Sequence, residues 1–246
     1  MVSDRISATG VQLSQPVCPM PASEIDRYSR NAHWRLYEKE WIFRNFPPNS
    51  KTWLDFGCGT GEITTQLALL GASRVIAVDV TPGLVEMARR RAEVDQVSDR
   101  VNAVCGDLTA LEPEPVDIVL SYAVLHHLPD RIHQVIPAVL RWLKPGGFFI
   151  YCEPIGYLPA LEWVRYRSGV SYDPLDPGER KLTGRDLSLL EQHFKSSRRV
   201  HFRTLSRLNR ILPAADRCFR RADAMLRGLP GSRLFAGIVL GVCQRR

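Results

Sequence analysis

Long apolar runs are missing from the 246-residue sequence, since none approaches the roughly 20 residues that a membrane-spanning helix needs. Residues 1–22 contain Ser, Thr, Gln and Pro, but no apolar segment behind a basic start, so they lack the features of a secretory signal. We therefore expect neither an integral membrane protein nor a secreted one. The predicted location is cytoplasmic.

A Cys-x-x-Cys pair is also missing and the cysteines are widely scattered, which argues against both a disulfide framework and a zinc cluster. The six cysteines are scattered at Cys18, Cys58, Cys105, Cys152, Cys218 and Cys243. We interpret most of them as small buried apolar residues.

Acidic residues are few near the C-terminal end. Residues 198–246 contain 12 arginines against Asp216 and Asp223, which gives this range a charge of +10, whereas the rest of the chain carries −3. Such a segment can bind nucleic acid, anionic lipid or an acidic substrate, or it can be a solvated helical face. Residues 203–229 interleave apolar residues with arginines as a membrane-surface helix does, so peripheral contact with an anionic membrane surface is one expectation.

Short apolar runs alternate with helical patterns from residue 51 onward, and this alternation predicts a parallel sheet. The expected strands are 51–56, 74–80, 101–106, 116–122, 148–152, 198–205 and 234–243. The expected helices are 62–70, 82 to about 91, 130–144 and 187–194. We predict an α/β fold with a doubly wound, mostly parallel seven-stranded sheet, helices on both faces and helical lid insertions.

The same patterns predict how the chain is divided. We expect a loose tail at 1–22, a helical cap at 23–50, and one domain at 51–246 with insertions at about 154–184 and 206–232. Tyr28, Trp34 and Tyr37 in the cap either close over a ligand or pack in the core.

A glycine-rich turn follows the first expected strand, where Gly57, Gly59 and Gly61 precede a helix. Glycine lets a ligand reach the backbone, and the helix beyond offers free N–H donors. The spacing differs from the Gly-x-Gly-x-x-Gly of NAD sites, and Asp55 before it suits a cationic group better than a pyrophosphate. Asp79 closes the second strand, where a carboxylate can accept hydrogen bonds from both ribose hydroxyls.

Three further segments extend this pattern: Gly106-Asp107-Leu108, residues 117–122 followed by 124–128, and residues 143–148. Together with the glycine turn they resemble the class I S-adenosylmethionine-dependent methyltransferase family, in its small-molecule branch. The resemblance implies S-adenosyl-L-methionine as cofactor and S-adenosyl-L-homocysteine as product. It also implies that Asp107 meets the adenine amino group.

In that family the glycine turn lies under the methionine portion, and the acid after the second strand holds the ribose. The predicted cofactor-binding residues are Asp55, Gly57, Gly59, Gly61, Asp79, Val80, Asp107, Leu108 and Ser121.

Methyl transfer also requires a positioned nucleophile and, where needed, a base. His126 and His127 follow the fourth expected strand, and a neutral histidine is suited to deprotonating a hydroxyl near neutral pH. His127 is the better candidate by position, although either ring can instead pack or contact the cofactor. Glu153 ends the fifth strand and is a third catalytic candidate, as a base, as an anchor for a substrate amine, or in a salt bridge.

A metal site and a nucleic-acid acceptor are both disfavoured. Pro129 breaks the helical spacing of His126, His127 and His133, and no acidic cluster ends the fourth strand, so we predict no metal. The Asn-Pro-Pro-Tyr pattern of many amino-group methyltransferases is missing, and residues 121–124 read Ser-Tyr-Ala-Val instead.

The leading hypothesis is methyl transfer to a small-molecule acceptor, at the hydroxyl of an aromatic or lipophilic metabolite. One alternative is an RNA methyltransferase that uses residues 198–246 against phosphates. Another is a non-catalytic, methyltransferase-like partner protein, which the intact glycine turn, Asp79 and Asp107 argue against. The sequence leaves the acceptor and the oligomeric state open.

Overall fold

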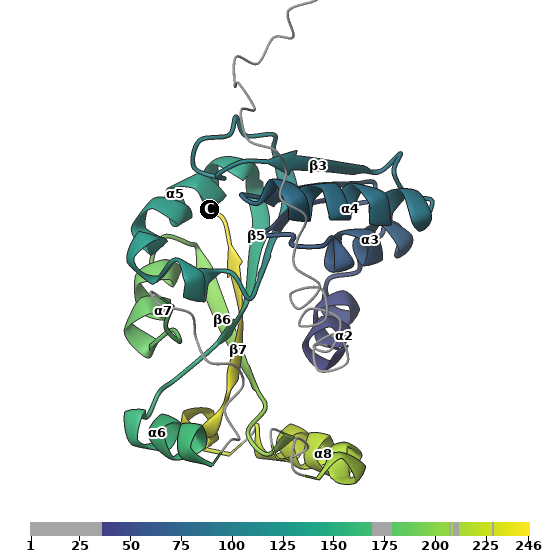
Figure 1. The fold of residues 1–246 in the computed structure, drawn as a ribbon. Coiled ribbons are helices and arrows are strands. Elements are labelled where there is room, and N and C mark those ends of the chain that lie inside the picture. Colours follow the sequence, from purple (N-terminus) through teal and green to yellow (C-terminus); the bar gives the residue numbers. More distant parts are fainter. Residues whose placement is uncertain (1–35, 169–178, 207, 209–211, 228) are drawn as a thin grey trace, which may run out of the picture.

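The structure is a computed structural model that describes residues 36–168, 179–206, 208, 212–227 and 229–246. Its centre is a seven-stranded sheet in the order β3-β2-β1-β4-β5-β7-β6 (Figure 1). The strands are β1 (Thr52–Phe56), β2 (Arg74–Asp79), β3 (Val101–Cys105), β4 (Val116–Tyr122), β5 (Leu143–Pro154), β6 (Ser196–Phe202) and β7 (Ile238–Gln244). Only β7 is antiparallel to its neighbours among these strands, which confirms the predicted, mostly parallel sheet.

Helices cover both faces of the sheet, as a doubly wound fold requires. In Figure 1, α5 and α7 lie on one face and α2, α3 and α4 on the other, while α6 and α8 lie beyond one end. The helices are α2 (Leu36–Asn45), α3 (Glu62–Leu69), α4 (Pro82–Val94), α5 (Ile132–Trp142), α6 (Pro159–Arg167), α7 (Gly184–Glu191) and α8 (Asp216–Leu226). Short 3-10 turns are η2 (Leu125–His127), η3 (Pro129–Arg131), η5 (Pro213–Ala215) and η6 (Ser232–Phe235). None of the described helices combines the length and apolar content that crossing a bilayer requires.

Successive residues of a strand point to opposite faces of the sheet, and helices cover both faces. The side chains of the central strands are therefore buried on both sides. In β1, Leu54 and Phe56 belong to the apolar layer under α5 and α7, whereas Trp53 belongs to the layer under α2 and α3. Ile118 and Val119 of β4 divide in the same way. Near-continuous apolar runs were therefore the correct signal for these strands.

Three predicted strands have wrong boundaries, namely β5, β6 and β7. β7 begins at Ile238 rather than at 234, because the residues before it form the 3-10 turn η6 (Ser232–Phe235). β5 extends well beyond the predicted 148–152, because β7 pairs along it from Phe148 to Pro154 and Leu143 pairs with Val116 across a bulge. β6 ends at Phe202 rather than at 205, because Arg203 adopts a φ of 61°, which no extended strand accommodates.

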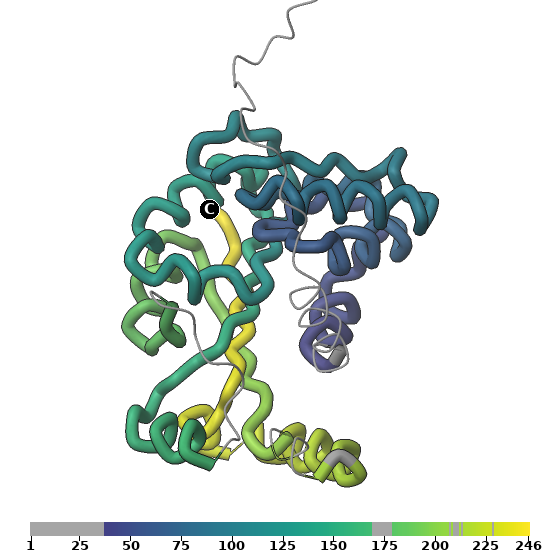
Figure 2. The backbone as a smooth tube through the Cα atoms, viewed as in Figure 1, coloured from purple at the N-terminus to yellow at the C-terminus, as the bar shows by residue number. Residues whose placement is uncertain are grey.

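The predicted cap and insertions contain helices, although parts of each lie outside the described residues. The cap range contains α2, whereas residues 1–22, Tyr28 and Trp34 are not described. The first insertion range contains α6 and the second contains η5 and α8. Figure 2 shows that the chain reaches α6 from the carboxyl end of β5 and α8 from the carboxyl end of β6.

Candidate functional site

A cavity of about 490 Å³ lies at the carboxyl ends of β1, β2, β3 and β4. Its walls include the segments that directly follow these strands, namely residues 57–60, 79–81, 106–108 and 122–124. Open α/β sheets bind their ligands at this edge, and the volume suits a small organic molecule. The fold therefore places one ligand site where the glycine turn and the predicted acids meet.

The three glycines of the turn have positive φ angles of 73°, 52° and 77°, but they serve different purposes. A Cβ on Gly57 would lie 2.4 Å from a methyl carbon of Val124, and one on Gly61 would lie 2.7 Å from the Cα of Ala88. These two glycines therefore allow close packing, and Gly61 does not line the cavity. A Cβ on Gly59 would meet nothing within 4 Å, so Gly59 is the position that leaves room for a ligand.

Asp79 holds the turn from the next strand. One carboxylate oxygen accepts a hydrogen bond from the backbone N–H of Gly59 at 3.0 Å, and the other accepts one from Thr81 at 2.9 Å. Each oxygen can accept a further bond, so the carboxylate can also receive ligand hydroxyls. Val80, another predicted contact, is exposed and lines the cavity.

Asp55 is buried, lines the cavity and accepts a hydrogen bond from the Thr64 hydroxyl at 2.6 Å. Burial raises the pKa of Asp55 to about 6, against the opposing effects of the Thr64 hydrogen bond and the positive charge of Lys39. Lys39 itself forms an ion pair with Glu62 at 2.6 Å, which joins α2 to the start of α3. The site thus contains a carboxyl that a cationic ligand would favour in its charged form.

The raised pKa of Asp55 predicts a pH-dependent stability. The folded protein holds this proton more tightly than the unfolded chain, whose pKa is near 3.8, so the stabilisation is complete below about pH 4 and is lost as pH rises through about 6. The difference of about two pKa units corresponds to about 3 kcal/mol. Urea unfolding across this range should show that decline in the wild type and a flatter profile in Asp55→Asn. Equal slopes for the two proteins would contradict the assignment.

Asp107 is held in its charged form. One oxygen accepts a hydrogen bond from Arg131 at 2.8 Å, and the other accepts two from the backbone and hydroxyl of Thr109. The guanidinium of Arg131 keeps the pKa of Asp107 below its ordinary value. Asp107, Arg131 and the buried Leu108 all line the cavity. Arg131, at the end of η3, was missed in the sequence, because nothing in the pattern of residues 130–144 distinguishes it from a solvated arginine.

Glu153 is fully buried and points at the loop after β4 rather than into the cavity. One carboxylate oxygen accepts hydrogen bonds from the backbone N–H groups of Val124 at 2.9 Å and Leu125 at 2.8 Å. The other oxygen lies 2.8 Å from Nδ1 of His126. The partner of Glu153 is thus a histidine and a loop backbone, and no arginine ion pair is formed within the described residues.

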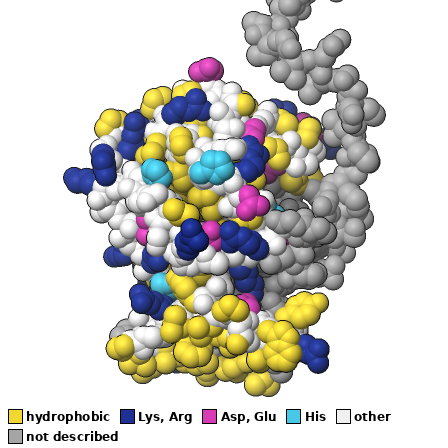
Figure 3. Space-filling model, turned by 90° about the vertical axis from the view of Figure 1, so that its left-hand side faces the viewer, with side chains coloured by type: hydrophobic (Ala, Val, Ile, Leu, Met, Phe, Trp, Pro, Cys, Tyr) yellow, Lys and Arg dark blue, Asp and Glu magenta, His cyan; other side chains and the backbone are white. Residues whose placement is uncertain are grey.

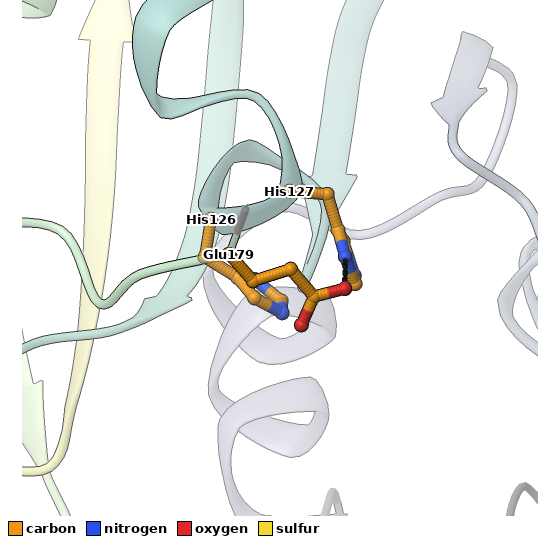
Figure 4. A group of neighbouring side chains, drawn as sticks. All are labelled: His126, His127 and Glu179. Atoms are coloured by element: carbon orange, nitrogen blue, oxygen red, sulfur yellow. Dashed lines mark hydrogen bonds and ion pairs between the residues drawn. The ribbon is translucent and has the colours of Figure 1, made fainter. Parts of the chain in front are cut away.

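His126 and His127 both line the cavity, with their rings 4.0 Å apart between centroids. Glu179, which is distant in sequence, bonds to Nδ1 of His127, and Figure 4 shows its carboxylate beside both imidazoles. The His127 side chain is 44% exposed, against 11% for His126. Each histidine therefore has a carboxylate at Nδ1, which leaves Nε2 as its second ring nitrogen for other contacts.

The same three side chains have the composition of a metal site. Ligand atoms of His126, His127 and Glu179 lie within 4.8 Å of one another, so this group is the one candidate for a divalent ion that the described residues form. Both Nδ1 atoms already bond to carboxylates, which supports their use in hydrogen bonding. A metal-free site stays a prediction.

Ser121 is placed differently from the other predicted contacts. It is fully buried, its hydroxyl has no partner among the described residues, and it does not line the cavity. The next residues, Tyr122 and Ala123, line the wall instead. Ala123 has a φ of 59°, a strained conformation for a residue with a Cβ, and such strain is common at ligand sites.

A second strained residue, Arg203, reaches the cavity from the end of β6. Its guanidinium forms a bidentate pair with the fully buried Glu38 of α2, at 2.6 Å and 3.1 Å. Lys181 also lines this wall and pairs with Glu162. No spacing rule links these residues, because each pair joins segments that are far apart in sequence.

Comparisons with known proteins find similarity to methyltransferases. A family model described as a methyltransferase domain matches residues 54–151. A ubiquinone biosynthesis O-methyltransferase of Xylella fastidiosa is 36% identical over 110 residues, covering 44% of this chain and 44% of that protein. Protein arginine N-methyltransferase 6 of Danio rerio is 34% identical over 167 residues, covering 60% and 47%.

The chain spans less than half the length of these curated relatives. Among solved structures, magnesium protoporphyrin IX methyltransferase (ChlM) from Synechocystis PCC 6803, with bound SAH, superimposes with a TM-score of 0.62 at 15% identity. The match covers 92% of this chain and 95% of that one, and it shows a shared fold.

Proposed function

Because residues 54–151 form a class I S-adenosylmethionine-dependent methyltransferase domain, we propose that the protein transfers a methyl group from S-adenosyl-L-methionine to a small-molecule acceptor. The observation that carries this proposal is the cavity in which Gly59, Asp55, Asp79 and Asp107 meet at one edge of the sheet. S-adenosyl-L-homocysteine is the expected product.

The residues present fit this cofactor. Gly59 leaves space that a side chain would fill, Asp79 offers acceptor oxygens for ribose hydroxyls, and Asp55 provides a carboxyl for a cationic group. Asp107 also lines the cavity, and in this proposal it meets the adenine amino group. The bound cofactor would supply an electrophilic methyl group on a sulfonium.

The open space at Gly59 gives a direct binding test. We expect Gly59→Val to weaken S-adenosyl-L-homocysteine binding by about tenfold or more. The valine side chain would occupy the open space at Gly59 and displace the ligand from contacts it would otherwise make there. Calorimetric titration measures the affinity. The matched control is Gly146→Val, because Gly146 also has a positive φ (74°) and open space but does not line the cavity. Equal losses in the two variants would show that backbone strain, not the cavity, is responsible.

We propose that the acceptor is a hydroxyl of an aromatic or lipophilic metabolite. Tyr122, Cys152, Pro154 and Ile238 line the cavity and would accommodate the apolar part of such an acceptor. The O-methyltransferase name of one relative supports oxygen as the methylated atom, although the likeness to a protein arginine methyltransferase shows that the shared core alone does not select an acceptor.

In this proposal His127 removes the acceptor proton. Its ring is the more exposed of the two at the cavity, and Glu179 fixes its orientation by holding Nδ1. His126 and Glu153 form the support beneath it, because Glu153 binds both the His126 ring and the backbone of the loop.

A transfer assay tests the whole proposal. The protein is incubated with S-adenosylmethionine labelled in the methyl group and a metabolite extract, and products are identified by mass spectrometry. Label in an O-methylated small molecule is the expected result. Label only in RNA or protein would overturn the acceptor assignment, and S-adenosyl-L-homocysteine binding without any transfer would favour the non-catalytic alternative.

The RNA alternative loses support from the structure, because many arginines of residues 198–246 are already engaged. Arg199 pairs with Glu191, Arg203 with Glu38 and Arg220 with Asp216. Arg227 lies against the rings of Tyr37 and Phe202. These four arginines therefore do not form a continuous set of free positive charges that could bind the phosphates of RNA. Cytoplasmic location remains a proposal.

A further inference from the structure

One end of the molecule exposes an unusual amount of apolar surface. Eight of the thirteen exposed large hydrophobic side chains in the described residues lie in or beside α6, α8 and η6. We call this surface the apolar end: Trp163, Val164, Tyr166, Leu212, Met225, Leu229, Leu234 and Phe235. Figure 3 shows hydrophobic side chains gathered over this end of the molecule. Patches of this kind mark interaction sites.

The apolar end is built by two insertions that are far apart in sequence. Trp163 and Tyr166 are three residues apart on α6, so they share one face of that helix, and they are 63% and 71% exposed. A side chain of the same helix, Arg165, is buried and donates a hydrogen bond to the backbone oxygen of Phe235 in η6. This hydrogen bond joins α6 of the first insertion to η6, which follows the second insertion along the chain.

The surface is also anchored to the fold. Asp223 of α8 is buried and accepts hydrogen bonds from the backbone of Leu205 at 2.6 Å and from the hydroxyl of Ser206 at 2.6 Å. Arg227 at the end of α8 packs on the ring of Phe202 in β6. These contacts hold one side of α8 against the fold, and Met225 lies exposed on its outer side.

Positively charged arginine side chains lie on the same elements as the apolar side chains. Arg217, Arg221 and Met225 follow at intervals of four on α8 and are all exposed. Arg167 on α6 and Arg233 in η6 are exposed as well. None of these four arginines forms an ion pair with a carboxylate of the described residues, unlike Arg165 and Arg220 nearby.

We propose that the apolar end docks on the surface of a bilayer that contains anionic lipid. Exposed Trp and Tyr side chains are suited to the interface between headgroups and acyl chains, and unpaired arginines are suited to anionic phosphates. A second copy of the chain fits less well, because a two-fold contact would bring the same unneutralised arginines against one another. Gly237 and Ile238 lie two and three residues after η6 and line the cavity, so docking would take place close to the cavity.

Vesicle flotation tests this surface without any methyl donor, and so independently of the proposed reaction. The full chain is mixed with vesicles of phosphatidylcholine alone, or of phosphatidylcholine and phosphatidylglycerol in equal parts, at low and high salt. We expect binding to the anionic vesicles, weakened by salt because screening reduces the contribution of the arginines.

Two paired variants separate the apolar and charged contributions. Trp163→Ser with Tyr166→Ser should weaken binding by about tenfold or more. Arg217→Gln with Arg221→Gln should weaken it by about 30-fold on anionic vesicles, since each arginine near such a surface contributes about fivefold. Leu69→Ser with Val94→Ser is the matched control, because both side chains are exposed but lie on α3 and α4.

Several outcomes would overturn the proposal. Absence of flotation, equal binding to both vesicle types, or paired variants that bind like the wild type would each exclude an anionic-lipid surface. A concentration-dependent dimer in lipid-free solution that is lost in the Trp163 and Tyr166 variant would instead assign the apolar end to a second copy. Unchanged thermal unfolding shows that each variant remains folded.

Discussion

His127→Ala should lower kcat by about 100-fold or more while leaving the affinity for S-adenosyl-L-homocysteine unchanged, because the ring is proposed to accept the acceptor's proton and not to hold the cofactor. Steady-state kinetics with the acceptor found by the transfer assay measures the loss. Added imidazole should restore part of the rate, since a small base can enter the space that the exposed ring leaves.

Variants around His127 sharpen this test. Glu179→Gln should lower kcat less than His127→Ala, and the double variant should be no worse than His127→Ala alone, because Glu179 acts through the ring. His133→Ala is the matched control, since His133 is exposed on α5 and does not line the cavity. Near wild-type kcat in His127→Ala, together with a large loss in His126→Ala, would move the base to His126.

Glu153→Ala should produce the largest loss of stability among the site variants. It removes the acceptor for the backbone N–H groups of Val124 and Leu125 and for the ring of His126, in a place that water does not reach. Leaving a buried hydrogen-bond donor without its acceptor costs about 1–3 kcal/mol for each donor. Thermal unfolding should record a decrease in Tm of roughly 10 °C for a protein of this size.

Glu153→Gln separates anchoring from catalysis. The amide keeps one oxygen that can accept the two backbone hydrogen bonds, so most of the stability and much of kcat should be retained. Glu93→Ala, at an exposed position on α4, should change the free energy of unfolding by less than about 0.5 kcal/mol. A Glu153→Gln protein that is stable yet inactive would identify Glu153 as the base and contradict the anchoring role.

The sheet was readable from the sequence because its signals are local. β1, β2, β3 and β4 are short apolar runs with turn residues behind them, and the structure places each within one residue of its predicted boundaries. β5 was misjudged at its ends because its limits depend on β7, which joins it from the far end of the chain, whereas β6 ends where Arg203 adopts a positive φ that the sequence does not signal. Long-range pairing leaves no local pattern.

In the candidate site, too, the residues with a local sequence signal could be predicted, and those that depend on long-range contacts could not. Gly59, Asp79 and Asp107 could be named because they follow strands whose carboxyl ends meet at one edge. Glu179 could not, because it reaches His127 across 52 positions of sequence. Glu153 was predicted as a base, as an anchor for a substrate amine or in a salt bridge, whereas its hydrogen bonds to the loop backbone indicate that it supports the site without lining the cavity.

The position of β7 also bears on how the chain assembles. Residues 238–244 lie between β5 and β6, which have no pairing with each other, so β6 can join the sheet only after these residues have emerged from the ribosome. The five strands β3-β2-β1-β4-β5 can pair earlier, while β5 presents an open edge. The half of the molecule that carries the glycine turn can therefore form first, and the half that carries α8 must wait for the strand that closes the sheet.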